Sequence, residues 1–141
     1  MIVVDTNVLS ELMKPQGLRA EAVVKWLRAL DLKSVYTTAV CVAEVLAGVA
    51  ILPAGRRRAE IVSSAERIFD SVFSGRILPF DEAAAKTYAT IVVARRKRGR
   101  STDPVDLQIA AIARANGMTV ATRNTGDFDD CGIDLINPWE T

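Results

Sequence analysis

The first predicted strand of the chain ends directly in a carboxylate. Residues 2–4 are three apolar β-formers (Ile-Val-Val), and Asp5 follows them. A short apolar run is typical of a strand buried on both faces, as in a parallel sheet. Because a charge is costly inside such a sheet, Asp5 is expected at the carboxyl end of the strand, where open α/β sheets bind their ligands. Taken alone, Asp5 would more simply cap the helix that the spacing of residues 8–14 predicts.

The rest of the chain alternates between helical and strand-like patterns. Helices are predicted over residues 18–30, 39–52, 56–73, 81–97 and 103–116, and strands over residues 35–38, 76–80, 118–122 and 133–136. Pro79 places the strand at residues 76–80 at an edge of the sheet or marks its end. The alternation predicts one domain over residues 1–141, a three-layer α/β/α sandwich with a mostly parallel central sheet.

Composition limits the available chemistry. The 141 residues include no histidine, which excludes Ser-His-Asp catalysis, Cys-His catalysis and an imidazole-based metal site. The two cysteines, Cys41 and Cys131, are far apart in the sequence and are typical of a reducing compartment. No run of apolar residues is long enough to span a membrane, and no basic flank precedes an apolar segment. We therefore expect a cytoplasmic protein that is neither inserted into a membrane nor secreted.

Three further carboxylates stand out in the sequence. Each could have a purely structural role, but that explanation is less convincing for all of them together. Glu44 is the one charge in the apolar helix predicted over residues 39–52, and glutamate is seldom buried without a partner. Asp106 falls in the first turn of a predicted helix, where the helix dipole by itself would favour an acid. Asp127 follows a predicted buried strand and would serve as an ordinary turn residue.

Together with Asp5, these carboxylates form a candidate metal site. If they converge, two of them about 4 Å apart repel by roughly 4 kcal/mol at an effective dielectric of about 20. Such a cluster needs bound cations or shifted protonation. Oxygen ligands without histidine or paired cysteine suit Mg²⁺ or Mn²⁺. A metal ion held in this way can promote phosphodiester hydrolysis without a protein nucleophile.

Four segments of the chain, in order, carry the motifs of a known family. They are residues 4–12 (Val-Asp-Thr-Asn-Val-Leu-Ser-Glu-Leu), 43–48 (Ala-Glu-Val-Leu-Ala-Gly), 104–111 (Pro-Val-Asp-Leu-Gln-Ile-Ala-Ala) and 121–128 (Ala-Thr-Arg-Asn-Thr-Gly-Asp-Phe). Together they resemble the PIN-domain ribonucleases over the whole chain, and they are most similar to the VapC/FitB-like toxins of type II toxin–antitoxin pairs. The resemblance implies a PIN-like fold and a Mg²⁺-dependent endoribonuclease whose substrate is RNA.

The resemblance also assigns roles to particular residues. It implies that Asp5, Glu44 and Asp106 are catalytic and bind Mg²⁺, with Mn²⁺ as a possible substitute. The fourth catalytic position falls on Asp127 or on Asn124. The residues expected to orient the carboxylates, or the water around the metal, are Thr6, Asn7, Thr122 and Asn124.

The implied partners follow from the same resemblance. A growth-arresting ribonuclease must be restrained, so a cognate antitoxin is implied, and its DNA-binding part would bring the pair to operator DNA indirectly. The helices predicted over residues 18–30 and 39–52 carry more apolar residues than one small sheet face needs. We expect one stretch to form a homodimer contact and part of another to form a groove for an antitoxin helix. The alternative is that all of these residues are internal core.

One basic cluster is a candidate for RNA binding. It consists of Arg95, Arg96, Lys97, Arg98 and Arg100. The dipole at a helix C-terminus favours cations by roughly 0.3–1 kcal/mol, which accounts for one or two of the five. We therefore expect the cluster to bind the RNA backbone close to the carboxylates, or an acidic tail of the antitoxin.

Other classes of protein fit the sequence less well. A phosphoacceptor receiver domain needs a second acid beside Asp5 and a lysine after a late strand, where this chain has Thr6 and Arg123. An aspartyl-phosphate phosphatase needs a second aspartate two residues after the first, where the chain has Asn7. A DNA-cutting or structure-specific nuclease, and a non-catalytic nucleic-acid-binding domain of the same fold, remain as alternatives.

Overall fold

The computed structural model describes all residues from 1 to 141, and its centre is a five-stranded sheet. The sheet order is β3-β2-β1-β4-β5, and every neighbouring pair is parallel. The strands are β1 (Ile2–Val4), β2 (Val35–Thr38), β3 (Ile77–Leu78), β4 (Thr119–Ala121) and β5 (Leu135–Ile136). The strand order reverses at β1, because β2 and β3 are added on one side and β4 and β5 on the other. The carboxyl ends of β1 and β4 therefore border the crevice in which such sheets bind ligands.

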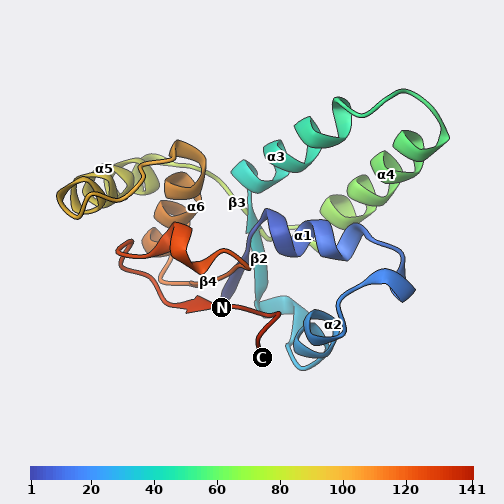
Figure 1. The fold of residues 1–141 in the computed structure, drawn as a ribbon, viewed down its shortest axis with the longest axis horizontal. Coiled ribbons are helices and arrows are strands. Elements are labelled where there is room, and N and C mark those ends of the chain that lie inside the picture. The colour runs from blue at the N-terminus through green and yellow to red at the C-terminus, as the bar shows by residue number, and fades with distance from the viewer.

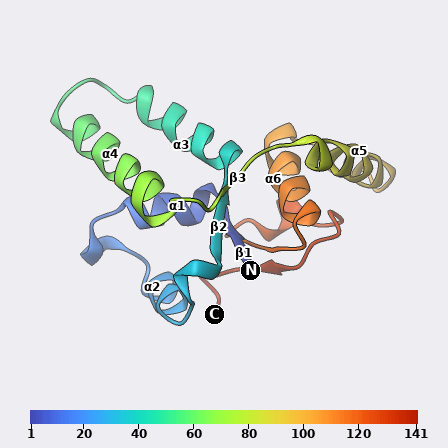
Figure 2. The same ribbon diagram turned by 180° about the vertical axis from the view of Figure 1, so that it is seen from behind.

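Helices flank the sheet. They are α1 (Thr6–Met13), α2 (Glu21–Arg28), α3 (Ala39–Ala50), α4 (Arg56–Arg67), α5 (Glu82–Lys97) and α6 (Pro104–Ala115). Short 3-10 turns, η1 (Gln16–Leu18), η2 (Leu32–Ser34) and η4 (Thr125–Phe128), lie between them. In Figures 1 and 2, α1, α3 and α4 lie to one side of β1 and β2, and α5 and α6 lie to the other. The predicted α/β fold with a parallel sheet is confirmed.

The core lies between the central strands and the helices that cover them. Val3 and Val4 on β1 and Val120 on β4 are fully buried, and residues 109–113 of α6 are buried without interruption. A strand buried on both faces carries apolar side chains at successive positions, as β1 does. The helices therefore leave no room for an unpaired charge inside the sheet, and the hydroxyl of Thr37, buried within β2, donates a hydrogen bond to the carbonyl of Val4 (3.0 Å).

Most predicted elements are present, with two corrections. The helix predicted over residues 18–30 begins only at Glu21, because Arg19 folds back and donates hydrogen bonds to the carbonyls of Leu12 (2.7 Å) and Lys14 (2.9 Å). The helix predicted over residues 56–73 ends as an α-helix at Arg67. A π-helical turn, η3 (Ile68–Val72), follows it and is closed by a bond from the Phe73 N–H to the carbonyl of Ile68.

Candidate active site

Asp5 leaves the sheet at the end of β1 and caps α1. Its Oδ1 accepts hydrogen bonds from the backbone N–H groups of Asn7 (3.0 Å) and Val8 (3.3 Å), so the simple capping role is correct. The carboxyl group is nevertheless only 5% exposed. Burial raises its pKa from 3.8 to about 6, against the opposing hydrogen bonds from Thr122 and the backbone, and the charge of Glu44 adds to the rise. The capping hydrogen bonds alone would lower the pKa of Asp5. Its raised pKa therefore comes from the surroundings of the carboxyl group other than the cap.

Glu44 reaches the same region from α3. This helix begins directly after β2, where the Thr38 hydroxyl oxygen accepts a hydrogen bond from the backbone N–H of Cys41 (3.0 Å). Glu44 lies on the second turn and is exposed. The Thr6 hydroxyl donates a hydrogen bond to Glu44 Oε1 at 2.6 Å. Thr6 is the residue after Asp5, so this bond links Glu44 to the turn between β1 and α1 that carries Asp5.

Asp106 comes from the first turn of α6 on the other side of the sheet. Asp103 caps this helix, and its Oδ1 accepts from the backbone N–H groups of Val105 (3.0 Å) and Asp106 (3.2 Å). A helix dipole alone would favour the charged form of Asp106 and hold its pKa down. Burial instead raises its pKa to about 6, followed by the charges of Asp103, Asp127, Glu44 and Asp5. Repulsion between carboxylates and burial therefore outweigh the dipole.

The loop after β4 supplies the remaining predicted polar groups. The Thr122 side chain is buried, and its hydroxyl lies 3.3 Å from the amide oxygen of Asn7 and accepts a bond from the Asn124 backbone N–H (3.1 Å). Asp127 lies on η4 and is exposed. The charge of Asp127 raises the pKa of Asp106, whereas both hydrogen bonds of Asn124 in this loop, with the Thr122 hydroxyl and with the Asp127 N–H, come from its backbone. Of the two candidates for the fourth catalytic position, Asp127 is the one whose charge acts on Asp106.

The donor set has the chemistry of a site for a hard cation. Asp5 and Asp106 have raised pKa values because burial and neighbouring carboxylates oppose their ionisation. A cation between them would relieve that repulsion, and all of the available donors are oxygens. As the side chains stand, no group of three or more Asp, Glu, His or Cys residues is arranged to hold one metal ion. Metal binding would therefore require the carboxylates to draw closer together.

The raised pKa values predict how stability depends on pH. A carboxyl group whose pKa rises from 3.8 to about 6 on folding binds its proton more tightly in the folded state. The stabilisation is complete below 3.8 and is lost as the pH rises through 6. We expect the free energy of unfolding of the metal-free protein, measured relative to an Asp5→Asn/Asp106→Asn variant, to fall between about pH 4 and pH 7. Urea unfolding of both proteins at several pH values measures this difference in the free energy of unfolding. A difference that does not change with pH would show that the pKa values of Asp5 and Asp106 are not raised in the folded state.

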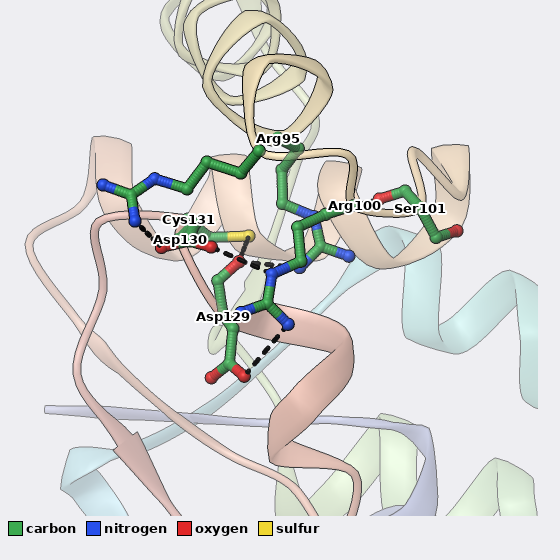
Figure 3. Close-up of polar contacts among 7 residues, drawn as sticks. Arg95, Arg100, Ser101, Asp129, Asp130 and Cys131 are labelled. Carbon is green, nitrogen blue, oxygen red and sulfur yellow. Dashed lines mark hydrogen bonds and ion pairs between the residues drawn. The ribbon is translucent and has the colours of Figure 1, made fainter.

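The structure divides the predicted basic cluster into side chains with different roles. Arg95 is only 3% exposed, and its guanidinium donates to the carbonyls of Ser101 (2.9 Å) and Asp129 (2.7 Å). Arg100 forms ion pairs with Asp129 (3.8 Å) and Asp130 (3.1 Å). Figure 3 shows that Arg95 and Arg100 both reach the turn at residues 129–131. The expectation of RNA binding does not fit Arg95, because its charged group is buried against main-chain carbonyls.

The other members of the cluster remain on the surface. Arg98 pairs with Asp130 at 3.6 Å and stays largely exposed. Arg96 and Lys97 are exposed and form no ion pair within the chain. Arg96 and Lys97 are therefore the only two of the five residues whose charged groups are exposed and free of an ion pair within the chain.

A cation-lined groove beside Glu44 was not foreseen from the sequence, which predicted only a groove for an antitoxin helix on one of the helices at residues 18–30 and 39–52. It has a volume of about 1010 Å³, and Thr6 and Glu44 are among its lining residues. Four cations line it, two in the segment between α1 and α2 and two on α4: Lys14, Arg19, Arg57 and Arg67. These residues are spread over more than fifty positions of the sequence and form no local cluster, so no motif marks them. Their shared position appears only once α1, α3 and α4 have packed together.

Comparison with known proteins places the chain in a family. A model of the PIN domain matches residues 2–133, and the chain belongs to the PIN-domain family. It is 42% identical over 140 residues to the VapC ribonuclease Y4jK of Sinorhizobium fredii, and 42% identical over 139 residues to toxin FitB of Neisseria gonorrhoeae. Each match covers 99% of both chains. The predicted resemblance to VapC/FitB-like proteins is confirmed.

Solved structures agree with this placement. A structure of FitAB bound to a DNA fragment contains a chain that matches with a TM-score of 0.87 and 44% identity, over 99% of this chain and 96% of that chain. The match extends over both the sheet and the flanking helices, so the fold of this chain is one already known in that protein. The chain contains no helix long and apolar enough to cross a membrane.

Proposed function

We propose that this protein is a Mg²⁺-dependent endoribonuclease and the toxin of a type II toxin–antitoxin pair. The observation that carries the proposal is that Asp5, Glu44 and Asp127, from three other segments, lie close enough to Asp106 for their charges to raise its pKa, and that Glu44 does the same to Asp5. Relatives named as a VapC ribonuclease and as toxin FitB support the same function. Mn²⁺ would satisfy the same oxygen ligands.

The chain's own residues would divide the work in the following way. Asp5, Glu44 and Asp106 would hold the cation, and Asp127 would complete the acidic rim. When bound, Mg²⁺ supplies Lewis-acid stabilisation of the charge that develops on the phosphoryl oxygens during hydrolysis by water. The backbone N–H groups at the start of α1 fix the Asp5 carboxylate, and the Thr6 hydroxyl fixes Glu44.

Polar groups around the carboxylates would keep them in place. Thr122 lies within hydrogen-bonding reach of both Asp5 and the Asn7 side chain, so it links the ends of β1 and β4. Asn124 in turn donates its backbone N–H to the Thr122 hydroxyl. Such supporting contacts fix the orientation of metal ligands, and their loss usually costs about 10- to 100-fold in metal affinity or activity.

The proposed partners are a cognate antitoxin and a second copy of the chain. The FitAB structure bound to DNA supports an antitoxin that contacts operator DNA. Of the two helices predicted to form a homodimer contact or an antitoxin groove, α3 leaves Leu46 44% exposed, and Ile51, directly after α3, is 85% exposed. Exposed apolar side chains of this size favour an interface. A monomeric mass by light scattering at micromolar concentration would count against the homodimer.

The function is tested by offering the purified protein RNA and DNA of the same sequence. We expect RNA cleavage in Mg²⁺, loss of cleavage in EDTA, and recovery when Mg²⁺ is added back in excess. Cleavage of DNA in preference to RNA would indicate the alternative nuclease class. RNA binding without cleavage under any divalent cation would indicate a non-catalytic domain.

A further inference from the structure

The groove is lined in part by Thr6 and Glu44 and so includes one of the predicted metal ligands. Its walls come from α1, α3 and α4, which also contact one another pairwise. Val45 and Val49 of α3, together with Met13 of α1, form part of an apolar floor. A ligand lying in this groove would therefore contact Glu44, one of the predicted metal ligands.

The walls of the groove carry an excess of positive charge. Lys14, Arg19, Arg57 and Arg67 face two carboxylates, Glu44 and Glu60. One of these carboxylates, Glu44, belongs to the candidate metal site. Excess positive charge along a groove raises the local concentration of anions and favours an extended polyanion over a neutral ligand.

The four cations differ in the contacts that they make within the chain. Arg19 is held by its bonds to the carbonyls of Leu12 and Lys14, which fix its charge without neutralising it. Lys14 pairs with Glu11 at 2.9 Å. Arg57 and Arg67 are exposed and form no ion pair within the chain. They are ten residues apart on α4, which is about 15 Å along the helix axis. The two side chains would therefore contact different phosphates of a bound backbone.

We propose that this groove is the path along which a single-stranded RNA backbone reaches the carboxylates. The proposal rests on the proposed ribonuclease function and names the surface that binds the substrate. No aromatic side chain lines the groove, so bases would gain little from stacking there. Binding would depend mainly on phosphate contacts, and would be tolerant of sequence and sensitive to salt. The predicted basic cluster on α5 would contribute less, because Arg95 is buried and Arg98 and Arg100 are paired with acids.

The test compares two double variants that each remove two positive charges. The groove variant is Arg57→Gln/Arg67→Gln, and the matched control is Arg96→Gln/Lys97→Gln on the surface of α5. All four side chains are exposed and unpaired within the chain, so both variants should fold, which thermal melting checks. Binding of a short fluorescein-labelled single-stranded RNA is measured by anisotropy in EDTA, over a series of salt concentrations, so that the RNA is not cut.

We expect the groove variant to bind RNA roughly tenfold more weakly than the wild type at low salt, with a salt slope smaller by about 1.4, which corresponds to two single-strand phosphate contacts. The control variant should change little. In Mg²⁺, the groove variant should raise the KM for cleavage and leave kcat nearly unchanged, because the carboxylates are intact. Thiouridine-containing RNA should crosslink to α4 peptides more than to α5 peptides.

Several results would overturn the groove proposal. One is a groove variant with the affinity and salt slope of the wild type, and another is an equal loss in the control variant. A third is weaker binding of poly-L-glutamate with unchanged binding of RNA, which would assign the groove to an acidic protein segment. These results are distinguishable from failure of the ribonuclease proposal, since RNA binding is measured without cleavage. A wild-type protein that binds RNA through the groove but never cuts it would leave the groove assignment standing.

Discussion

Replacement of Asp5 or Asp106 by asparagine is expected to abolish Mg²⁺-dependent RNA cleavage. Each change removes a negative charge from the proposed cation site and keeps the shape of the side chain. We expect the rate to fall by at least about a thousandfold, which corresponds to about 4 kcal/mol of lost transition-state stabilisation. The measurement is single-turnover cleavage of a labelled RNA, with Asp70→Asn as the matched control. Asp70 is exposed and lies on η3, on a different segment from any site residue.

Loss of activity should not come from loss of folding. In Asp5→Asn, the amide oxygen can still accept the N–H groups of Asn7 and Val8, so the cap on α1 is kept. Ionisation of Asp5 at pH 7 opposes folding by up to about 3 kcal/mol, because its pKa rises from 3.8 to about 6. The variant should therefore be as stable as the metal-free wild type or more stable. An Asp5→Asn protein with undiminished Mg²⁺-dependent activity would rule out its role as a metal ligand.

Arg95→Met is expected to produce the largest loss of stability among the basic residues. The buried guanidinium joins the segment before α6, through the carbonyl of Ser101, to the turn after η4, through the carbonyl of Asp129. Methionine keeps the apolar stem but leaves the Ser101 carbonyl unpaired and the Asp129 carbonyl with only the weak Cys131 thiol donor (3.7 Å), at about 1–3 kcal/mol each. We expect the free energy of unfolding to fall by about 3 kcal/mol and the melting temperature by roughly 10 °C.

The control for this prediction is Arg98→Met. Arg98 is largely exposed and its closest approach to Asp130 is 3.6 Å, so its loss should cost less than about 1 kcal/mol. Urea unfolding of the two variants measures both values. If Arg95→Met were as stable as the wild type and instead bound RNA more weakly, the original expectation of RNA binding by Arg95 would be restored.

The contrast between Asp5 and Arg95 shows what the sequence can predict. Asp5 follows an apolar strand directly, and a strand buried on both faces forces a charge to its end. Local sequence is therefore enough to locate Asp5 at the sheet edge, and the same reasoning applies to the loop after β4. Arg95 lies among basic neighbours on an exposed helix end. Its inward direction depends on Asp129, which is 34 residues away, and no local pattern reports that contact.

Electrostatic environments were harder to predict than positions. The place of Asp106 in the first turn of α6 is evident from Pro104 and the capping Asp103. The helix dipole there favours a charged acid, but the pKa of Asp106 is raised, because burial opposes its ionisation and the charges of Asp103, Asp127, Glu44 and Asp5 add to that effect. The groove cations could not be grouped from the sequence either, since their spacing along the chain is irregular and only the fold brings the segment after α1 beside α4.

The most direct test of the account is to locate the metal in a crystal of the wild-type protein grown or soaked with Mn²⁺. We expect an anomalous difference peak at the edge of the sheet, with oxygens of Asp5 and Asp106 as ligands and Glu44 directly or through water. The carboxylates should lie closer together than in the structure described here, because a bound cation relieves their repulsion. An actively cleaving protein whose Mn²⁺ peak lies away from all three carboxylates would contradict the account.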